Sequence, residues 1–153
     1  MKFKVSQLPV NVHKDMVTAV CWTPSNELYT CSDDKSIMKW NLQGDTLGKV
    51  CDLDAYVTDM SWFPSSGQQT SDFFAVACTD GSVRMISKTG TEQKKIKEVA
   101  GGAVICLKWS FDGNSLATGG EDGKVKLWSR SGMLRNNFSG EPAAVYTLAW
   151  GPD

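Results

Sequence analysis

The side chains that could catalyse a reaction are one histidine, His13, and a small set of carboxylates. A histidine beside a carboxylate can act in general acid–base catalysis. The carboxylates are Asp33, Asp34, Asp80, Glu121 and Asp122. They recur at the same point of three similar segments, CSDDKSIMKWN, CTDGSVRMIS and GEDGKVKLWS. A position repeated in this way indicates a turn in a structural repeat, so we predict no catalytic residue and no enzymatic activity.

The sequence lacks the residues that a typical metal site or a nucleophilic catalytic site requires. There are five cysteines, Cys21, Cys31, Cys51, Cys78 and Cys106, and no C-x-x-C pair. With a single histidine, the chain has too few closely spaced ligands for a typical zinc site, and most Ser-His or Cys-His sites are excluded. No G-x-x-x-x-G-K-[ST] phosphate loop occurs. We therefore expect no metal, no cofactor, and reduced cysteines that pack as small apolar residues.

A second sequence motif alternates with these segments, and each copy of it contains one tryptophan. The copies are AVCWTPS, DMSWFPS, LKWSFDG and LAWGPD, which carry Trp22, Trp62, Trp109 and Trp150. A two-part repeat of roughly 40–45 residues is typical of β-propeller blades. We interpret these tryptophans as mostly core residues, because each can bury about 150–250 Å².

The residues between the tryptophans position the repeated turns on strands. Short apolar runs bounded by turn residues predict four antiparallel strands in each unit. In the second and third units these strands are 57–62, 73–77, 83–87 and 93–99, then 104–109, 115–118, 125–129 and 133–138. A strand over 145–150 would begin a fourth unit.

The predicted fold class is therefore all-β, a β-propeller with antiparallel four-stranded blades. Its blades span about 11–52, 53–99 and 100–139, and 140–153 begins blade four. Residues 2–8 can form an outer strand that closes the ring. The chain would then hold about three and a half blades, half of a ring, and we expect it to be part of a longer protein.

The turns between the second and third strands differ in one residue. Blades two and three have Asp80-Gly81 and Asp122-Gly123, and glycine adopts a positive φ without strain. Blade one has Lys35 in place of the glycine. Its turn should therefore be of another type or strained.

The ending G-E-D-G-K-V-K-L-W, with His13 upstream of the first unit, resembles the WD40-repeat family. That resemblance implies a buried network in which a loop histidine, a strand serine or threonine, the turn aspartate and the closing tryptophan are hydrogen-bonded. Blade one can supply it from His13, Thr30 (or Ser32), Asp34 and Trp40.

The other two blades match this pattern less completely. Blade three has Thr118, Asp122 and Trp128, but glycine stands where the histidine should be. Blade two has Val76 and Ile86, so only its Asp80 remains. The resemblance therefore implies a partial network in blade three and none in blade two.

Longer strings narrow the resemblance. ELYTCSDDKSIMKWNL, EDGKVKLWSRSGMLR and VYTLAWGPD are similar to the N-terminal propeller of a WD40 subunit family of intraflagellar transport complex B. This implies a non-catalytic scaffold in cilium assembly and maintenance, located in the cilium or flagellum, basal body and cytoplasm. The implied partners are other complex B subunits, with kinesin and dynein motors and tubulin cargo reached indirectly. Homodimer formation through regions beyond this segment is a further option, and no direct membrane contact is implied.

A different class of function stays open at this point. A WD40 propeller can also be a substrate adaptor of a ubiquitin ligase or part of an RNA-processing complex. The net charge of −1, from 16 basic and 17 acidic residues, lacks the basic surplus of a nucleic-acid-binding protein. No apolar run is long enough to span a membrane.

Candidate contact residues lie in loops and on the rim. An insertion after the first strand of blade two includes Ser65, Gly67, Gln68 and Gln69, which can contact a partner or form a surface loop without a binding role. Basic residues gather in the third and outer strands of blades two and three: Lys88, Lys94, Lys95, Lys97, Lys124, Lys126, Arg130 and Arg135. We interpret them as a solvated rim, with an acidic protein or RNA as the alternative.

Overall fold

The computed structural model describes residues 12–64, 72–140 and 142–152. Over these ranges the chain forms strands and turns without any helix. The predicted outer strand over 2–8 and the predicted contact loop (Ser65, Gly67, Gln68 and Gln69) lie outside the described residues. The strands of the described ranges form three antiparallel sheets of four strands each, which confirms the all-β class.

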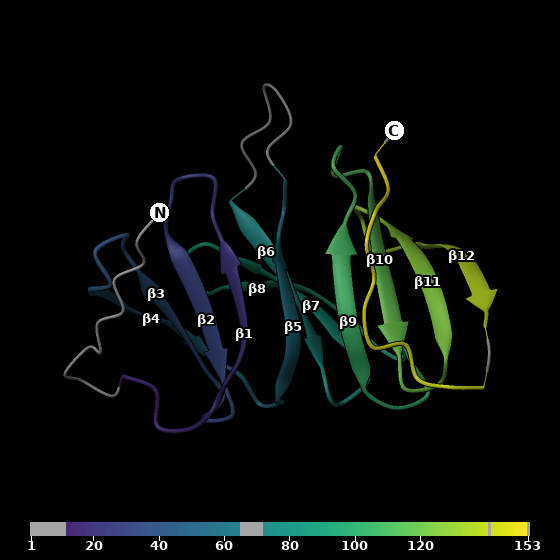
Figure 1. The fold of residues 1–153 in the computed structure, drawn as a ribbon, viewed down its shortest axis with the longest axis horizontal. Coiled ribbons are helices and arrows are strands. Elements are labelled where there is room, and N and C mark those ends of the chain that lie inside the picture. The colour runs from purple at the N-terminus through teal and green to yellow at the C-terminus, as the bar shows by residue number, and fades with distance from the viewer. Residues whose placement is uncertain (1–11, 65–71, 141, 153) are drawn as a thin grey trace, which may run out of the picture.

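Each sheet follows chain order from its first strand to its fourth. The first sheet contains β1 (Val17–Trp22), β2 (Leu28–Ser32), β3 (Ser36–Trp40) and β4 (Thr46–Asp52). The second contains β5 (Val57–Trp62), β6 (Phe73–Cys78), β7 (Val83–Ser87) and β8 (Glu92–Ile96). The third contains β9 (Val104–Trp109), β10 (Ser115–Gly120), β11 (Lys124–Ser129) and β12 (Leu134–Ser139). The sheets stand side by side, and their first strands β1, β5 and β9 are neighbours (Figure 1).

The three sheets share one register. The last residue of each first strand is a tryptophan, and Trp22, Trp62 and Trp109 pair with Leu28, Phe74 and Leu116 of the second strands. The same alignment makes Thr30, Val76 and Thr118 equivalent. The repeat read in the sequence is therefore also a repeat in space.

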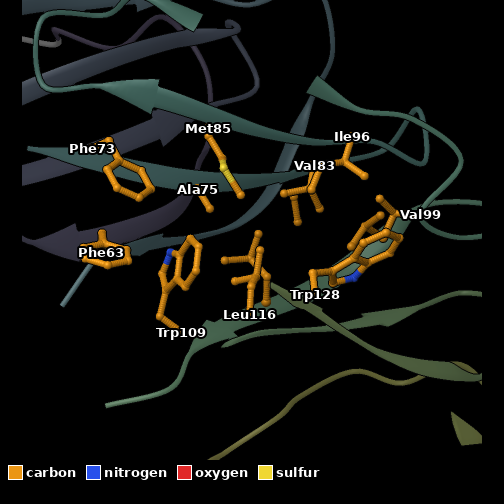
Figure 2. Close-up of a cluster of buried hydrophobic side chains, with 13 residues drawn as sticks. Phe63, Phe73, Ala75, Val83, Met85, Ile96, Val99, Trp109, Leu116 and Trp128 are labelled. Atoms are coloured by element: carbon orange, nitrogen blue, oxygen red, sulfur yellow. The ribbon is translucent and has the colours of Figure 1, made fainter. Parts of the chain in front are cut away.

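Two apolar clusters hold the sheets together face to face. Between the first two sheets, Trp62 packs on Tyr29 with ring centroids 5.0 Å apart and stacks on Phe74 at 5.5 Å. Between the second and third sheets, Phe63 and Trp109 meet edge to face at 5.1 Å. Figure 2 shows this second cluster running from Phe63 and Trp109 to Trp128. Burial of these faces supplies the main driving force for stacking.

The interpretation of the strand-ending tryptophans as core holds for two positions and is wrong for Trp22. Trp62 and Trp109 are 8% and 6% exposed, whereas Trp22 is 54% exposed. The difference follows from stacking: Trp62 and Trp109 each face the preceding sheet, and no described sheet lies in front of β1.

The predicted strand over 145–150 is not a strand in the structure. This segment lies against the third sheet, where the Val145 N–H donates to the Gly120 carbonyl at 3.0 Å. The Trp150 indole donates to the Lys108 carbonyl at 3.1 Å. In the three described sheets the first strand pairs with the second strand of its own sheet, and no described strand pairs with 145–150 in this way.

Candidate functional site

The four residues proposed for the blade-one network are brought together in the structure. The Trp40 Nε1–H donates to Thr30 Oγ1 at 2.9 Å, and His13 Nε2 lies 2.7 Å from the same oxygen. His13 Nδ1 lies 3.2 Å from Asp34 Oδ2. An indole N–H can only donate, so the Thr30 hydroxyl accepts from Trp40 and can donate to His13, whose other ring nitrogen then donates to Asp34. Ser32, the alternative to Thr30, instead donates to the Asp15 carbonyl.

Asp34 is held as a carboxylate by donors from two directions. The Lys14 N–H donates to it at 2.8 Å, and Ser36 donates through its N–H at 2.8 Å and its hydroxyl at 2.6 Å. Burial acts to raise the pKa of Asp34, but the hydrogen bonds from Ser36, Lys14 and His13 lower it well below its usual range. A carboxyl group in this state carries no proton to donate at neutral pH.

The blade-one turn is strained and is not of another type. Lys35 has a φ of 65°, close to the 76° of Gly81 and the 73° of Gly123 at the equivalent positions. The turn is therefore similar in all three blades, and blade one adopts it with a side chain that disfavours this region. The Lys35 ammonium lies over the ring of Tyr56, 4.6 Å from its centroid.

Blade three keeps part of the network and replaces the histidine with backbone. The Trp128 indole donates to Thr118 Oγ1 at 2.9 Å. Asp122 accepts from the N–H groups of Gly101 at 3.0 Å and Lys124 at 3.2 Å. Burial acts to raise the pKa of Asp122, but these backbone donors lower it overall.

Blade two contains an arrangement that sequence reasoning missed. Arg84, only 4% exposed, lies in β7 and pairs with Asp54, with Asp80 at 3.1 Å and with Glu92 at 3.6 Å. Lys95 adds a second ion pair to Asp80 at 3.1 Å. Val76 and Ile86 have no polar side-chain atom that could hydrogen-bond to Asp80. Arg84, which lies opposite Val76 in the adjacent strand, pairs with Asp80 instead. The sequence did contain a signal for this arrangement. Arg84 is an isolated arginine in the third strand of a blade whose threonine and tryptophan positions are both apolar.

The turn aspartates together do not form an acid–base pair. Burial acts to raise the pKa of Asp80, but Ser82, Lys95 and Arg84 lower it well below its usual range. All three turn aspartates are thus ionised and occupied by donors from their own blade or its connecting loop. Their geometry supports a role in fixing turns.

The cysteines lie mainly at the interface of the first two sheets and resist ionisation. Burial raises the pKa of Cys21 to about 12 and of Cys51 and Cys78 to about 11. Protonated thiols are poor nucleophiles and poor metal ligands. In the described part of the chain, no group of three or more His, Cys, Asp or Glu side chains is placed to hold a metal ion. No helix there could span a membrane.

Comparison with known proteins identifies the repeat. The family model "WD domain, G-beta repeat" matches residues 5–41 and 93–129. The chain carries WD40 repeats. The two matches include the turns of blades one and three, the blades in which a Trp–Thr hydrogen bond forms. Blade two, where Arg84 pairs with the turn aspartate Asp80, lies mostly outside the WD40 matches.

Two curated relatives match over the whole chain. The Intraflagellar transport protein 80 homolog of Rattus norvegicus is 41% identical over 159 residues, and that of Mus musculus is 40% identical. Both matches cover 100% of this chain and 20% of the relative, so the chain spans about a fifth of the length of these relatives.

Solved structures confirm the fold. The crystal structure of the computationally designed Ika4 protein matches with a TM-score of 0.76 at 21% identity, covering 99% of this chain and 89% of the other. The designed Ika8 protein matches with a TM-score of 0.73 over 92% of this chain and 42% of the other. With the WD40 repeats, these matches confirm the predicted β-propeller class.

Proposed function

We propose that the chain is a non-catalytic scaffold segment of intraflagellar transport complex B that serves cilium assembly and maintenance. The observation that carries this proposal is the 41% identity to the rat Intraflagellar transport protein 80 homolog over the whole chain. By contrast, the SIR4-interacting protein SIF2 of Saccharomyces cerevisiae is 42% identical over only 33% of this chain. The WD repeat-containing protein 70 of Xenopus laevis is 27% identical over 76%. The match to the Intraflagellar transport protein 80 homolog thus combines 41% identity with coverage of the whole chain.

The geometry of the turns supports a scaffold over an enzyme. The carboxylates Asp34, Asp80 and Asp122 are each occupied by donors within the fold, and their lowered pKa values keep them ionised. Rigid turns of this kind hold the loops at the ends of the sheets in place, and such loops are where a scaffold contacts its partners. The proposed partners are other complex B subunits, with motors and tubulin cargo reached through them.

The proposed locations are the cilium or flagellum, the basal body and the cytoplasm. Homodimer formation would use regions of a longer polypeptide. The test is affinity purification of the complete polypeptide that carries this sequence, tagged and expressed in ciliated cells, followed by mass spectrometry. Enrichment of complex B subunits over an unrelated tagged WD40 protein is the expected result. Enrichment of a ubiquitin-ligase core or of RNA-processing proteins in their place would refute the proposal.

A further inference from the structure

The fourth strand of each sheet has one open edge. β4, β8 and β12 each pair with a single neighbouring strand of their sheet, so part of their backbone N–H and C=O groups points away from the sheet. The sheets stack through their faces, and β12 is the strand of the third sheet farthest from β9 (Figure 1). Stacking therefore leaves the edge of β12 uncovered. An open edge can pair with an added extended segment unless the edge is protected.

The edges of β8 and β4 carry protecting features. Glu92, Lys94 and Lys95 place three charged side chains in the five residues of β8. β4 has two register shifts against β3, and it contains Gly48 at a φ of 108°. Charged side chains and bulges are the usual means by which proteins prevent pairing at an edge. The first and second sheets are therefore poorly suited to accept a further strand.

β12 lacks the charges that protect β8. Equivalent positions in the two strands are those that pair with equivalent residues of the third strands. They are Glu92 and Leu134, Lys94 and Asn136, and Lys95 and Asn137. All six residues of β12 are exposed, and its one register shift against β11 lies before Asn136. From Asn136 to Ser139 the edge is therefore regular and uncharged.

Arg135 is the only charged residue of β12. Its guanidinium donates to Ser115 Oγ at 3.3 Å, and a neutral hydroxyl group does not compensate the charge. Among the described residues, no carboxylate forms an ion pair with Arg135. Beside it, Met133 and Leu134 are 69% and 51% exposed. A segment that complements this edge has a carboxylate for Arg135 and an apolar side chain for Leu134.

We propose that the edge of β12 pairs with an extended segment of a partner protein that has one acidic residue among uncharged ones. The backbone of this segment hydrogen-bonds to the open edge, its carboxylate pairs with Arg135, and an apolar side chain packs on Leu134. In strand addition of this kind the backbone supplies affinity and the side chains supply specificity. The inference rests on the proposed scaffold function, for which it names a docking edge.

The test uses fluorescence anisotropy with the complete polypeptide that carries this sequence. The probe is a fluorescein-labelled peptide of alternating threonine and valine with one central glutamate. We expect binding that Asn136→Glu weakens by about tenfold, because a carboxylate protects the edge and repels the glutamate. Gln93→Glu is the matched control, since it converts an exposed amide to a carboxylate on the edge of β8, which is already charged. Circular dichroism checks that each variant is folded.

Arg135→Gln tests the charge complementarity separately. The parent should bind the glutamate peptide more tightly than a peptide with glutamine in its place, because only the glutamate forms an ion pair with Arg135. In Arg135→Gln this preference should disappear. A preference of the same size in the variant would show that Arg135 does not select the acidic residue, and would overturn that part of the inference.

Three outcomes would overturn the docking edge: no binding of the glutamate peptide, equal binding of the same peptide with N-methylated backbone, or equal losses in Gln93→Glu and Asn136→Glu. Dimers that the peptide dissociates and Asn136→Glu abolishes, measured by analytical ultracentrifugation, would replace the partner segment with a second copy of the polypeptide. The scaffold proposal is tested separately by purification from ciliated cells. Peptide binding without complex B subunits would refute that proposal alone, and the reverse result would refute only the docking edge.

Discussion

The equivalent residues Trp22 and Trp62 should differ sharply in their contribution to stability. Both end the first strand of their sheet, but only Trp62 is covered, by Tyr29 and Phe74. Trp62→Ala opens a cavity between two sheets, whereas Trp22→Ala removes a side chain from a largely open face. The pair therefore tests whether stacking of the sheets, and not the repeat sequence itself, makes these tryptophans stabilising.

The expected difference follows from the exposed fractions. Trp22 is 54% exposed and Trp62 is 8% exposed, so nearly half of the side-chain surface differs in burial. For a side chain of about 250 Å² this is about 115 Å², or about 3 kcal/mol at roughly 25 cal/mol/Å². Replacement of a buried tryptophan by alanine costs about 3–5 kcal/mol. We therefore expect about 4–5 kcal/mol for Trp62→Ala and about 1–2 kcal/mol for Trp22→Ala.

The assay is urea unfolding followed by far-ultraviolet circular dichroism, which does not depend on the substituted chromophore. Each variant is measured at two protein concentrations. Equal free-energy losses for the two variants would refute the stacking argument. A Trp22→Ala loss that grows with protein concentration would show that another molecule covers the β1 face in solution.

Two further predictions concern the blade-one turn. Lys35→Gly should be more stable than Lys35→Ala by about 1 kcal/mol, because both lose the contact with Tyr56 but only glycine relieves the positive φ; equal urea midpoints would contradict this. The lowered pKa of Asp34 stabilises the fold above the unfolded-state value of 3.8, and this contribution is lost as pH falls through the folded-state pKa. Asp34→Asn should therefore be less stable than the parent by about 1–3 kcal/mol at neutral pH. The gap should narrow below about pH 5, and a gap that stays constant in acid would show that the charge of Asp34 is not what stabilises the turn.

Blade two shows where the sequence pattern ceased to be informative. The loss of the threonine and tryptophan at Val76 and Ile86 predicted that the WD40 hydrogen bonds would not form there. It did not indicate what would satisfy Asp80, because the charged group is assembled from three separate places in the chain. Arg84 in β7 and Lys95 in β8 pair with Asp80, and Asp54 before β5 pairs with Arg84. Their meeting depends on strand register and on the path of a loop, which no local pattern specifies.

The pocket that Lys94, Arg130 and Phe73 line together illustrates the same limit for the candidate contact residues. The basic residues of the rim were visible in the sequence, and Lys94 and Arg130 were among them. Their convergence over Phe73 depends on how the third sheet stacks against the second. Other members of the same set have different surroundings, such as Lys88 beside Glu27.

The sequence by itself determined the repeat, the four-strand pattern of each blade and the residues of the blade-one network, because strand alternation and turn chemistry act over a few residues. Tertiary structure alone decided which of the equivalent positions are buried. Trp22 and Trp62 occupy the same position of the repeated motif, but Trp22 is exposed and Trp62 is part of the core. A tryptophan at this position is buried only where a neighbouring sheet packs against it. The stacking of the sheets provides such a neighbour for Trp62 and not for Trp22.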